Sequence, residues 1–129
     1  VLPDADILYL AMPETPGTKN LISRKRLDLL KPSCGIVNIG RQSTMDYDAL
    51  CEKLRANKIA GAILDVFTPE PIELNSKLWE IPNLIITPHV SSDDGESYVR
   101  LTLELFTKNL KLFISNKPLI NQVNKNLGY

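Results

Sequence analysis

The stretch KPSCGIVNIGR, residues 31–41, indicates the fold, because a lysine-proline turn leads into a short apolar run that stops at a glycine and an arginine. Similar runs occupy residues 7–12, 60–67 and 84–87, and Pro13 and Pro88 stop the first and last of them. Three of the four runs are almost continuously apolar, which is typical of strands buried on both faces of a parallel sheet. The sequence therefore predicts about four parallel strands.

Helical patterns separate these runs. Ser23 is positioned to cap a short helix reaching about Leu30, and Asp46 to cap a second one ending near Asn57. No clear helix is expected between the third and fourth runs. A long last helix is predicted from Ser92 or Asp93 to about Ser115. Alternating strands and helices with right-handed crossovers give an α/β fold.

The last helix carries more apolar residues than one buried face requires. One predicted stripe holds Tyr98, Leu101, Leu105 and Leu112, and a second set covers much of the remaining surface: Val99, Leu103, Phe106, Leu110 and Phe113. We therefore expect it to contact a partner subunit or a further domain.

Composition excludes several classes of protein. The 129 residues suit one domain, and 15 Lys and Arg balance 15 Asp and Glu, which gives no electrostatic reason to expect nucleic acid or an anionic membrane as partner. Cys34 and Cys51 do not make a disulfide framework, and with a single histidine they offer no zinc site, so no metal is expected. Reduced thiols favour a cytoplasmic location.

Polar residues follow the carboxyl ends of the predicted strands, which is where parallel sheets bind ligands. The second strand leads to Arg41, the third to Asp65 and then Glu70, and the fourth to His89. Each has a structural alternative. Arg41 can cap a helix or pair with Asp46, and Glu70 can be a solvated loop residue. Asp65 can serve loop packing, and His89 can be a hydrogen-bonded structural residue. A buried Asp65 in particular requires satisfied hydrogen bonds. No Gly-x-Gly-x-x-Gly pattern runs through the six glycines.

Four segments together resemble the D-isomer-specific 2-hydroxyacid dehydrogenases, which are NAD(P)-dependent oxidoreductases. They are LAMPETPGT (10–18), LLKPSCGIVNIGR (29–41), GAILDVFTPEP (61–71) and LIITPHV (84–90). The resemblance implies the second half of a Rossmann-type sheet, with residues 1–115 forming the C-terminal half of a dinucleotide-binding domain and 116–129 a tail.

The resemblance also implies a reaction and roles. A small 2-oxo acid and a D-2-hydroxy acid would be interconverted by hydride transfer with NAD or NADP. Arg41 would bind the substrate, His89 would be the acid–base, and Glu70 would pair with His89. Asp65 would accept a hydrogen bond from the nicotinamide carboxamide, beside a pocket also lined by Met12, Pro13, Ile39, Gly40, Arg41 and His89.

The chain departs from the family pattern in places. Gln42 stands where glycine usually follows the arginine, and Ser91 and Ser92 stand where glycine or alanine is common. The family's glycine-rich loop and substrate domain are not recognised here, so we do not expect residues 1–129 alone to bind the cofactor or to be active. The alternative is a truncated, inactive half-domain that self-associates or binds a partner. For both readings we expect the protein to be a homo-oligomer, with a dimer as the first expectation. The region 74–82 around Trp79 looks most like the glyoxylate and hydroxypyruvate reductase branch.

Overall fold

The computed structural model describes all 129 residues and divides them into two compact units, Val1–Ser91 and Ser92–Tyr129. This division differs from the expected boundary between residues 115 and 116, which stays a prediction.

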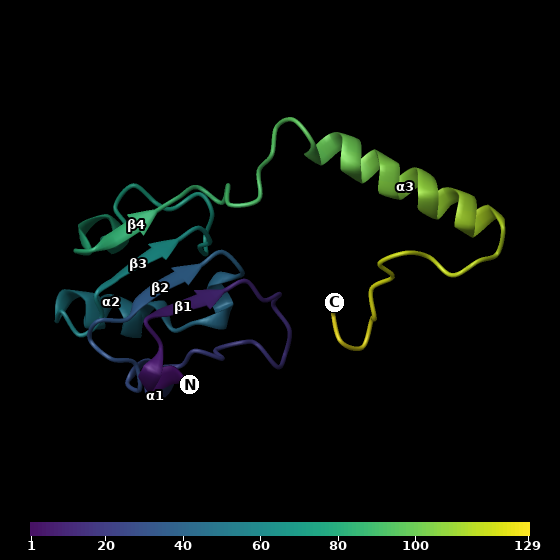
Figure 1. The fold of residues 1–129 in the computed structure, drawn as a ribbon. Helices are drawn as coiled ribbons and strands as arrows, with labels where there is room; N and C mark the ends of the chain where they lie inside the picture. The colour runs from purple at the N-terminus through teal and green to yellow at the C-terminus, as the bar shows by residue number, and fades with distance from the viewer. The chain divides into compact units, whose positions relative to one another are not determined.

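The first unit contains a four-stranded parallel sheet in the order β1-β2-β3-β4, as the sequence predicts (Figure 1). The strands are β1 (Ile7–Leu10), β2 (Gly35–Asn38), β3 (Gly61–Leu64) and β4 (Leu84–Ile86). They are shorter than the apolar runs. After β2 the side-chain oxygen of Asn38 accepts the Gly40 N–H at 3.0 Å, so that the backbone turns away from the ladder there.

Two helices and two 3₁₀ turns connect the strands, and a third 3₁₀ turn precedes β1. The helices are α1 (Arg24–Leu27) and α2 (Tyr47–Arg55); the turns are η1 (Leu2–Asp4), η2 (Gln42–Thr44) and η3 (Lys77–Glu80). Asp46 caps α2 as predicted, because its carboxylate accepts the Ala49 N–H at 2.9 Å. Helix α1 is one turn long and ends before the predicted Leu30, and η3 lies in the loop where no clear helix was expected.

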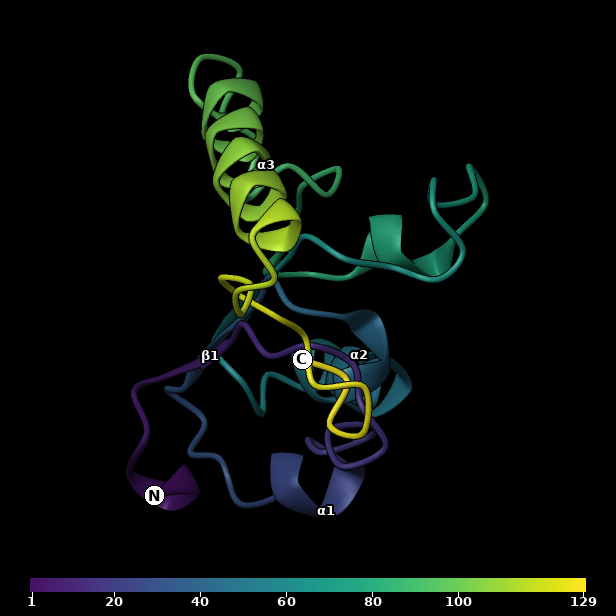
Figure 2. The ribbon, with the colours of Figure 1, turned by 90° about the vertical axis from the view of Figure 1, so that its right-hand side faces the viewer.

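Only one face of the sheet is covered within this unit, so the expectation of strands buried on both faces is wrong for these residues. Helices α1 and α2 lie on the same side of the sheet (Figure 2), as right-handed crossovers require. That side buries Leu10, Ile36 and Leu64. On the opposite face the row Tyr9–Val37–Ile63–Ile85 leaves Tyr9 57% and Ile85 58% exposed.

The second unit contains α3 (Tyr98–Ile114), which starts later than predicted. The carboxylate of Asp94 accepts the Glu96 and Ser97 N–H groups, so residues 94–97 form a turn before the helix. The helix ends at Ile114 with Ser115 as its C-cap, close to the predicted end at about Ser115, and none of its residues is buried. The side chain of Asn109 forms two hydrogen bonds with the Ile120 backbone, 2.8 and 3.1 Å long, which fix the following segment.

None of the helices combines the length and the apolar character that crossing a membrane requires.

Candidate active site

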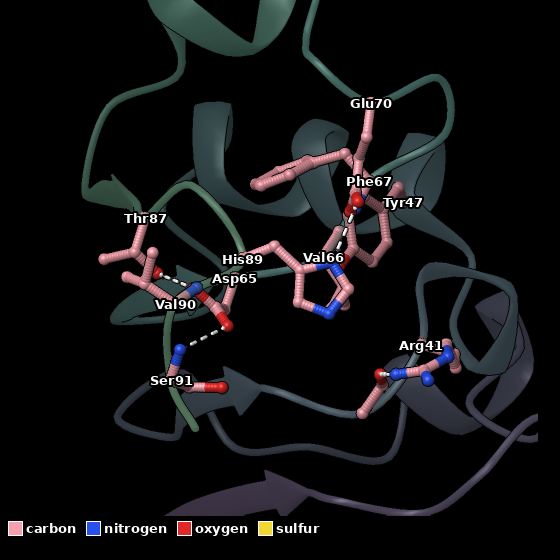
Figure 3. Close-up of polar contacts among 11 residues, drawn as sticks. Arg41, Tyr47, Asp65, Val66, Phe67, Glu70, Thr87, His89, Val90 and Ser91 are labelled. Carbon is pink, nitrogen blue, oxygen red and sulfur yellow. Dashed lines mark hydrogen bonds and ion pairs between the residues drawn. The ribbon is translucent and has the colours of Figure 1, made fainter. Parts of the chain in front are cut away.

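The four polar residues singled out in the sequence all lie beyond the carboxyl ends of the strands. Arg41 follows β2, Asp65 and Glu70 follow β3, and His89 follows β4 (Figure 3). Because all strands are parallel, these ends share one edge of the sheet.

Glu70 and His89 are joined by a hydrogen bond. The Glu70 Oε2 lies 2.8 Å from the His89 Nδ1, while its Oε1 accepts the Phe67 N–H at 2.6 Å. These two hydrogen bonds, with that from His89 the larger effect, lower the pKa of Glu70. An ionised carboxylate can only accept hydrogen bonds, so the Nδ1 of His89 carries the proton of this contact. The other ring nitrogen, Nε2, points away from Glu70, toward the side of the view where Arg41 lies (Figure 3).

The backbone of His89 has a φ of 57°, in the left-handed region that residues other than glycine seldom adopt. Such conformations persist where surrounding contacts hold them, and they cluster at functional sites. The contacts here come from Asp65.

Asp65 is 1% exposed and carries three hydrogen bonds. Its Oδ1 accepts from the Thr87 hydroxyl at 2.5 Å and the Val90 N–H at 2.9 Å, and its Oδ2 accepts the Ser91 N–H at 2.9 Å. Burial raises its pKa, but the hydrogen bonds outweigh burial and lower the pKa to about 2. The structure thus satisfies the buried charge by fastening both sides of the His89 loop to the end of β3.

Arg41 is exposed and makes no pair with Asp46, which is occupied in capping α2. Its Nη1 donates to the Gly40 carbonyl at 2.7 Å. No hydrogen bond or ion pair joins its side chain to Glu70 or His89, so the remaining guanidinium N–H groups stay available to a ligand.

The predicted nicotinamide-pocket residues lie together at the ends of β1 and β2. The Ile39 N–H donates to the Leu10 carbonyl at 3.0 Å, which carries the strand pairing one residue further. A Cβ on Gly40 would lie 2.7 Å from the Met12 carbonyl oxygen, so only glycine permits this approach. Pro13 follows, with its carbonyl accepting the Thr18 hydroxyl at 2.7 Å.

A cavity of about 440 Å³ adjoins the Glu70–His89 pair. The remaining wall of this cavity is largely apolar and includes Phe67, Pro71, Ile72, Trp79, Ile86 and Pro88. The pair itself stays partly accessible to solvent, with 43% of the His89 side chain and 35% of the Glu70 side chain exposed. No cluster of three or more His, Cys, Asp or Glu residues lies close enough to hold a metal ion.

Three buried polar residues near Arg41 were missed by the sequence reasoning: Asn38, Thr44 and Tyr47. The Arg41 carbonyl accepts from the Thr44 hydroxyl at 2.6 Å and from the Asn38 amide at 3.3 Å. The Tyr47 hydroxyl accepts from Asn38 at 3.2 Å and donates to the Val66 carbonyl at 2.9 Å. The polar Asn38 inside an apolar run was the one available signal.

Comparison with known proteins supports the resemblance. Residues 1–91 match the sequence profile described as D-isomer specific 2-hydroxyacid dehydrogenase, NAD binding domain. The chain is 34% identical over 124 residues to D-3-phosphoglycerate dehydrogenase of Escherichia coli K12, covering 93% of this chain and 30% of that protein. It is 41% identical over 97 residues to glyoxylate/hydroxypyruvate reductase B of Pectobacterium carotovorum, covering 75% and 30%.

Solved structures give the same family. A D-isomer specific 2-hydroxyacid dehydrogenase from Xanthobacter autotrophicus Py2, crystallised with NADPH and MES, superposes with a TM-score of 0.91 at 33% identity, over 99% of this chain and 52% of that one. The NADPH-dependent glyoxylate/hydroxypyruvate reductase of Sinorhizobium meliloti, in complex with NADP and sulfate, gives 0.89 at 30% identity, over 99% and 41%. The chain thus spans about half or less of the proteins it matches. It belongs to the D-isomer specific 2-hydroxyacid dehydrogenase family and carries residues of its NAD-binding domain.

Proposed function

We propose that these residues form part of an NAD(P)-dependent oxidoreductase that interconverts a small 2-oxo acid and a D-2-hydroxy acid. The observation that carries the proposal is the Glu70–His89 pair at the strand ends, with its 2.8 Å contact and with Arg41 on the same edge.

His89 acts as the acid–base. Glu70 holds the proton on Nδ1 and fixes the ring, so Nε2 is the nitrogen that faces the substrate. In the protonated imidazolium Nε2 donates its proton to the oxygen that becomes the hydroxyl, and in the reverse direction it takes that proton back.

Arg41 binds the substrate carboxylate. Its Nη1 donates to the Gly40 carbonyl, and the planar guanidinium presents its other N–H groups as a fork. Charge and planarity together favour a carboxylate with an adjacent carbonyl oxygen.

The cofactor, when bound, supplies the hydride that the carbonyl carbon accepts. The nicotinamide end would lie against Met12, Pro13, Ile39 and Gly40. Because Gly40 has no side chain, the backbone that follows β1 and the backbone that follows β2 approach each other closely there. Asp65 was predicted to accept from the carboxamide. It is buried, and its oxygens already accept from Thr87, Val90 and Ser91, so this role stays a prediction beside its observed contacts.

The test is a hydride-transfer assay on the full-length native chain, followed at the absorbance of the reduced nicotinamide. NADH and NADPH are each paired with glyoxylate and hydroxypyruvate, and NAD and NADP with D-3-phosphoglycerate, which separates the reductase and dehydrogenase branches among the relatives. We expect Arg41→Ala and His89→Ala to reduce kcat/KM by at least about 100-fold. Turnover near the wild-type level in either variant contradicts the role given to that residue.

We also propose that the protein associates with itself, most simply as a homodimer. Supporting this are the exposed apolar row on the sheet and the exposed apolar residues of α3, such as Phe106 and Phe113. The alternative role, an inactive half-domain that only binds partners, rests on the same surfaces. Sedimentation at tens of micromolar tests association: a monomer contradicts it. The activity assay separates the two roles.

We propose a cytoplasmic location because of the state of the two cysteines. Cys34 and Cys51 are both free and buried, and burial raises the pKa of each thiol. Neither is therefore poised to react, and reduced thiols are the rule in the cytoplasm.

A further inference from the structure

The substrate-binding turn and the acid–base pair come from different loops, yet a buried hydrogen-bond network joins them. The turn Gly40–Arg41 follows β2, whereas Glu70 and His89 follow β3 and β4. The side chain of Arg41 forms no hydrogen bond or ion pair with Glu70 or His89. The relative placement of the two groups therefore depends on residues behind them.

Asn38 fastens the turn. Its side-chain oxygen accepts the Gly40 N–H at 3.0 Å, and its amide nitrogen donates to the Arg41 carbonyl at 3.3 Å. The same nitrogen donates to the Tyr47 hydroxyl at 3.2 Å. Both N–H groups of the Asn38 amide therefore donate a hydrogen bond, one to the turn and one to Tyr47.

Tyr47 continues the network to the other loop. Its hydroxyl donates to the Val66 carbonyl at 2.9 Å, and its ring meets the Phe67 ring edge to face, with centroids 6.2 Å apart. The Phe67 N–H in turn donates to Glu70, which holds His89. Tyr47 is 8% exposed, so its hydroxyl has no water to replace these partners.

We propose that Tyr47 is a positioning residue for the reaction: its buried hydroxyl sets where the Arg41 turn stands relative to the Glu70–His89 pair. The inference rests on the proposed function, since it assigns Tyr47 to the same site. A substrate held by Arg41 must meet Nε2 of His89 at hydrogen-bond distance, and a small displacement of one group relative to the other is costly for the rate.

The variant that tests this is Tyr47→Phe in the full-length native chain, because it removes the hydroxyl and keeps the ring. Two readouts are used. Amide hydrogen exchange of the Gly40 and Phe67 N–H groups reports the network without any activity, and each is expected to lose about tenfold in protection. Steady-state kinetics report the consequence: kcat falls and KM for the 2-oxo acid rises, about tenfold in kcat/KM, while KM for the cofactor is unchanged.

Two control variants separate positioning from general loss of stability. Thr44→Val removes the one hydroxyl that donates to the Arg41 carbonyl, so we expect it to raise the 2-oxo acid KM with no change at the Phe67 amide. Ile36→Val trims a buried side chain on β2 away from the site, and we expect wild-type kinetics at comparable destabilisation.

The outcomes are distinct. If Tyr47→Phe leaves both amides protected, or if its kinetics match those of Ile36→Val, the inference is overturned. A wild-type protein with no hydride transfer on any 2-oxo acid overturns the proposed function instead. In that event the exchange measurement still decides whether Tyr47 couples the two loops.

Discussion

Replacing Asp65 with asparagine removes a buried charge while keeping the shape of the side chain, and its cost follows from the structure. The pKa of the carboxyl falls from an ordinary 3.8 to about 2 on folding. Since one pKa unit corresponds to about 1.4 kcal/mol, the ionised form contributes roughly 2 kcal/mol to the free energy of unfolding.

The hydrogen bonds give the same magnitude. Asparagine has one oxygen acceptor, which suits the two donors at Oδ1, so its NH₂ group then faces the Ser91 N–H. A buried N–H left without an acceptor costs about 1–3 kcal/mol. We therefore expect Asp65→Asn to lower the free energy of unfolding by about 2 kcal/mol at pH 7.

The pH dependence gives the sharper test. A group whose pKa is lowered in the folded state contributes fully well above its unfolded value of 3.8, and this contribution is lost as the pH falls through about 2. The difference between wild type and Asp65→Asn should therefore be constant above about pH 5 and fall to roughly half at pH 3.

Urea unfolding of the native chain at several pH values measures this, with amide exchange at Val90 and Ser91 as the local probe. Asp93→Asn is the matched control, because Asp93 is exposed and its side chain makes no hydrogen bond. A difference below about 0.5 kcal/mol at pH 7, or one that is equal at pH 7 and pH 3, refutes this account of Asp65.

Three further predictions concern the site itself. Gly40→Ala forces a Cβ to within 2.7 Å of a backbone oxygen, so it should cost about 1–3 kcal/mol in urea unfolding and raise the cofactor KM, whereas Gly95→Ala, with open space around it, should do neither. Arg41→Lys keeps the charge but loses the planar fork, so KM for the 2-oxo acid should rise at least about tenfold; unchanged KM means that charge alone binds the substrate. Glu70→Gln should reduce kcat at pH 7. Because the pKa of Glu70 is lowered, the difference in kcat between wild type and this variant should disappear only as the pH falls below 4.5. A difference that already disappears near neutral pH contradicts the assignment.

The sheet and the edge on which the site lies could be predicted because their signals are local. Pro13 and Pro88 stop apolar runs, Asp46 caps its helix three residues away, and parallel strands bring their carboxyl ends together. The pairing of Glu70 with His89 was anticipated from family resemblance, and the geometry places the two atoms 2.8 Å apart.

By itself, the sequence determined an α/β sheet, the polar residues that follow its strands and the family to which the chain belongs. Only the tertiary structure decided that the buried charge of Asp65 fastens the His89 loop, that Tyr47 connects two loops, and that one sheet face stays uncovered within its unit. Those features join residues 19 to 26 positions apart, or depend on which surfaces meet. Periodicity and capping patterns reach only a few residues along the chain, whereas a hydrogen bond between two loops depends on where folding brings each of them.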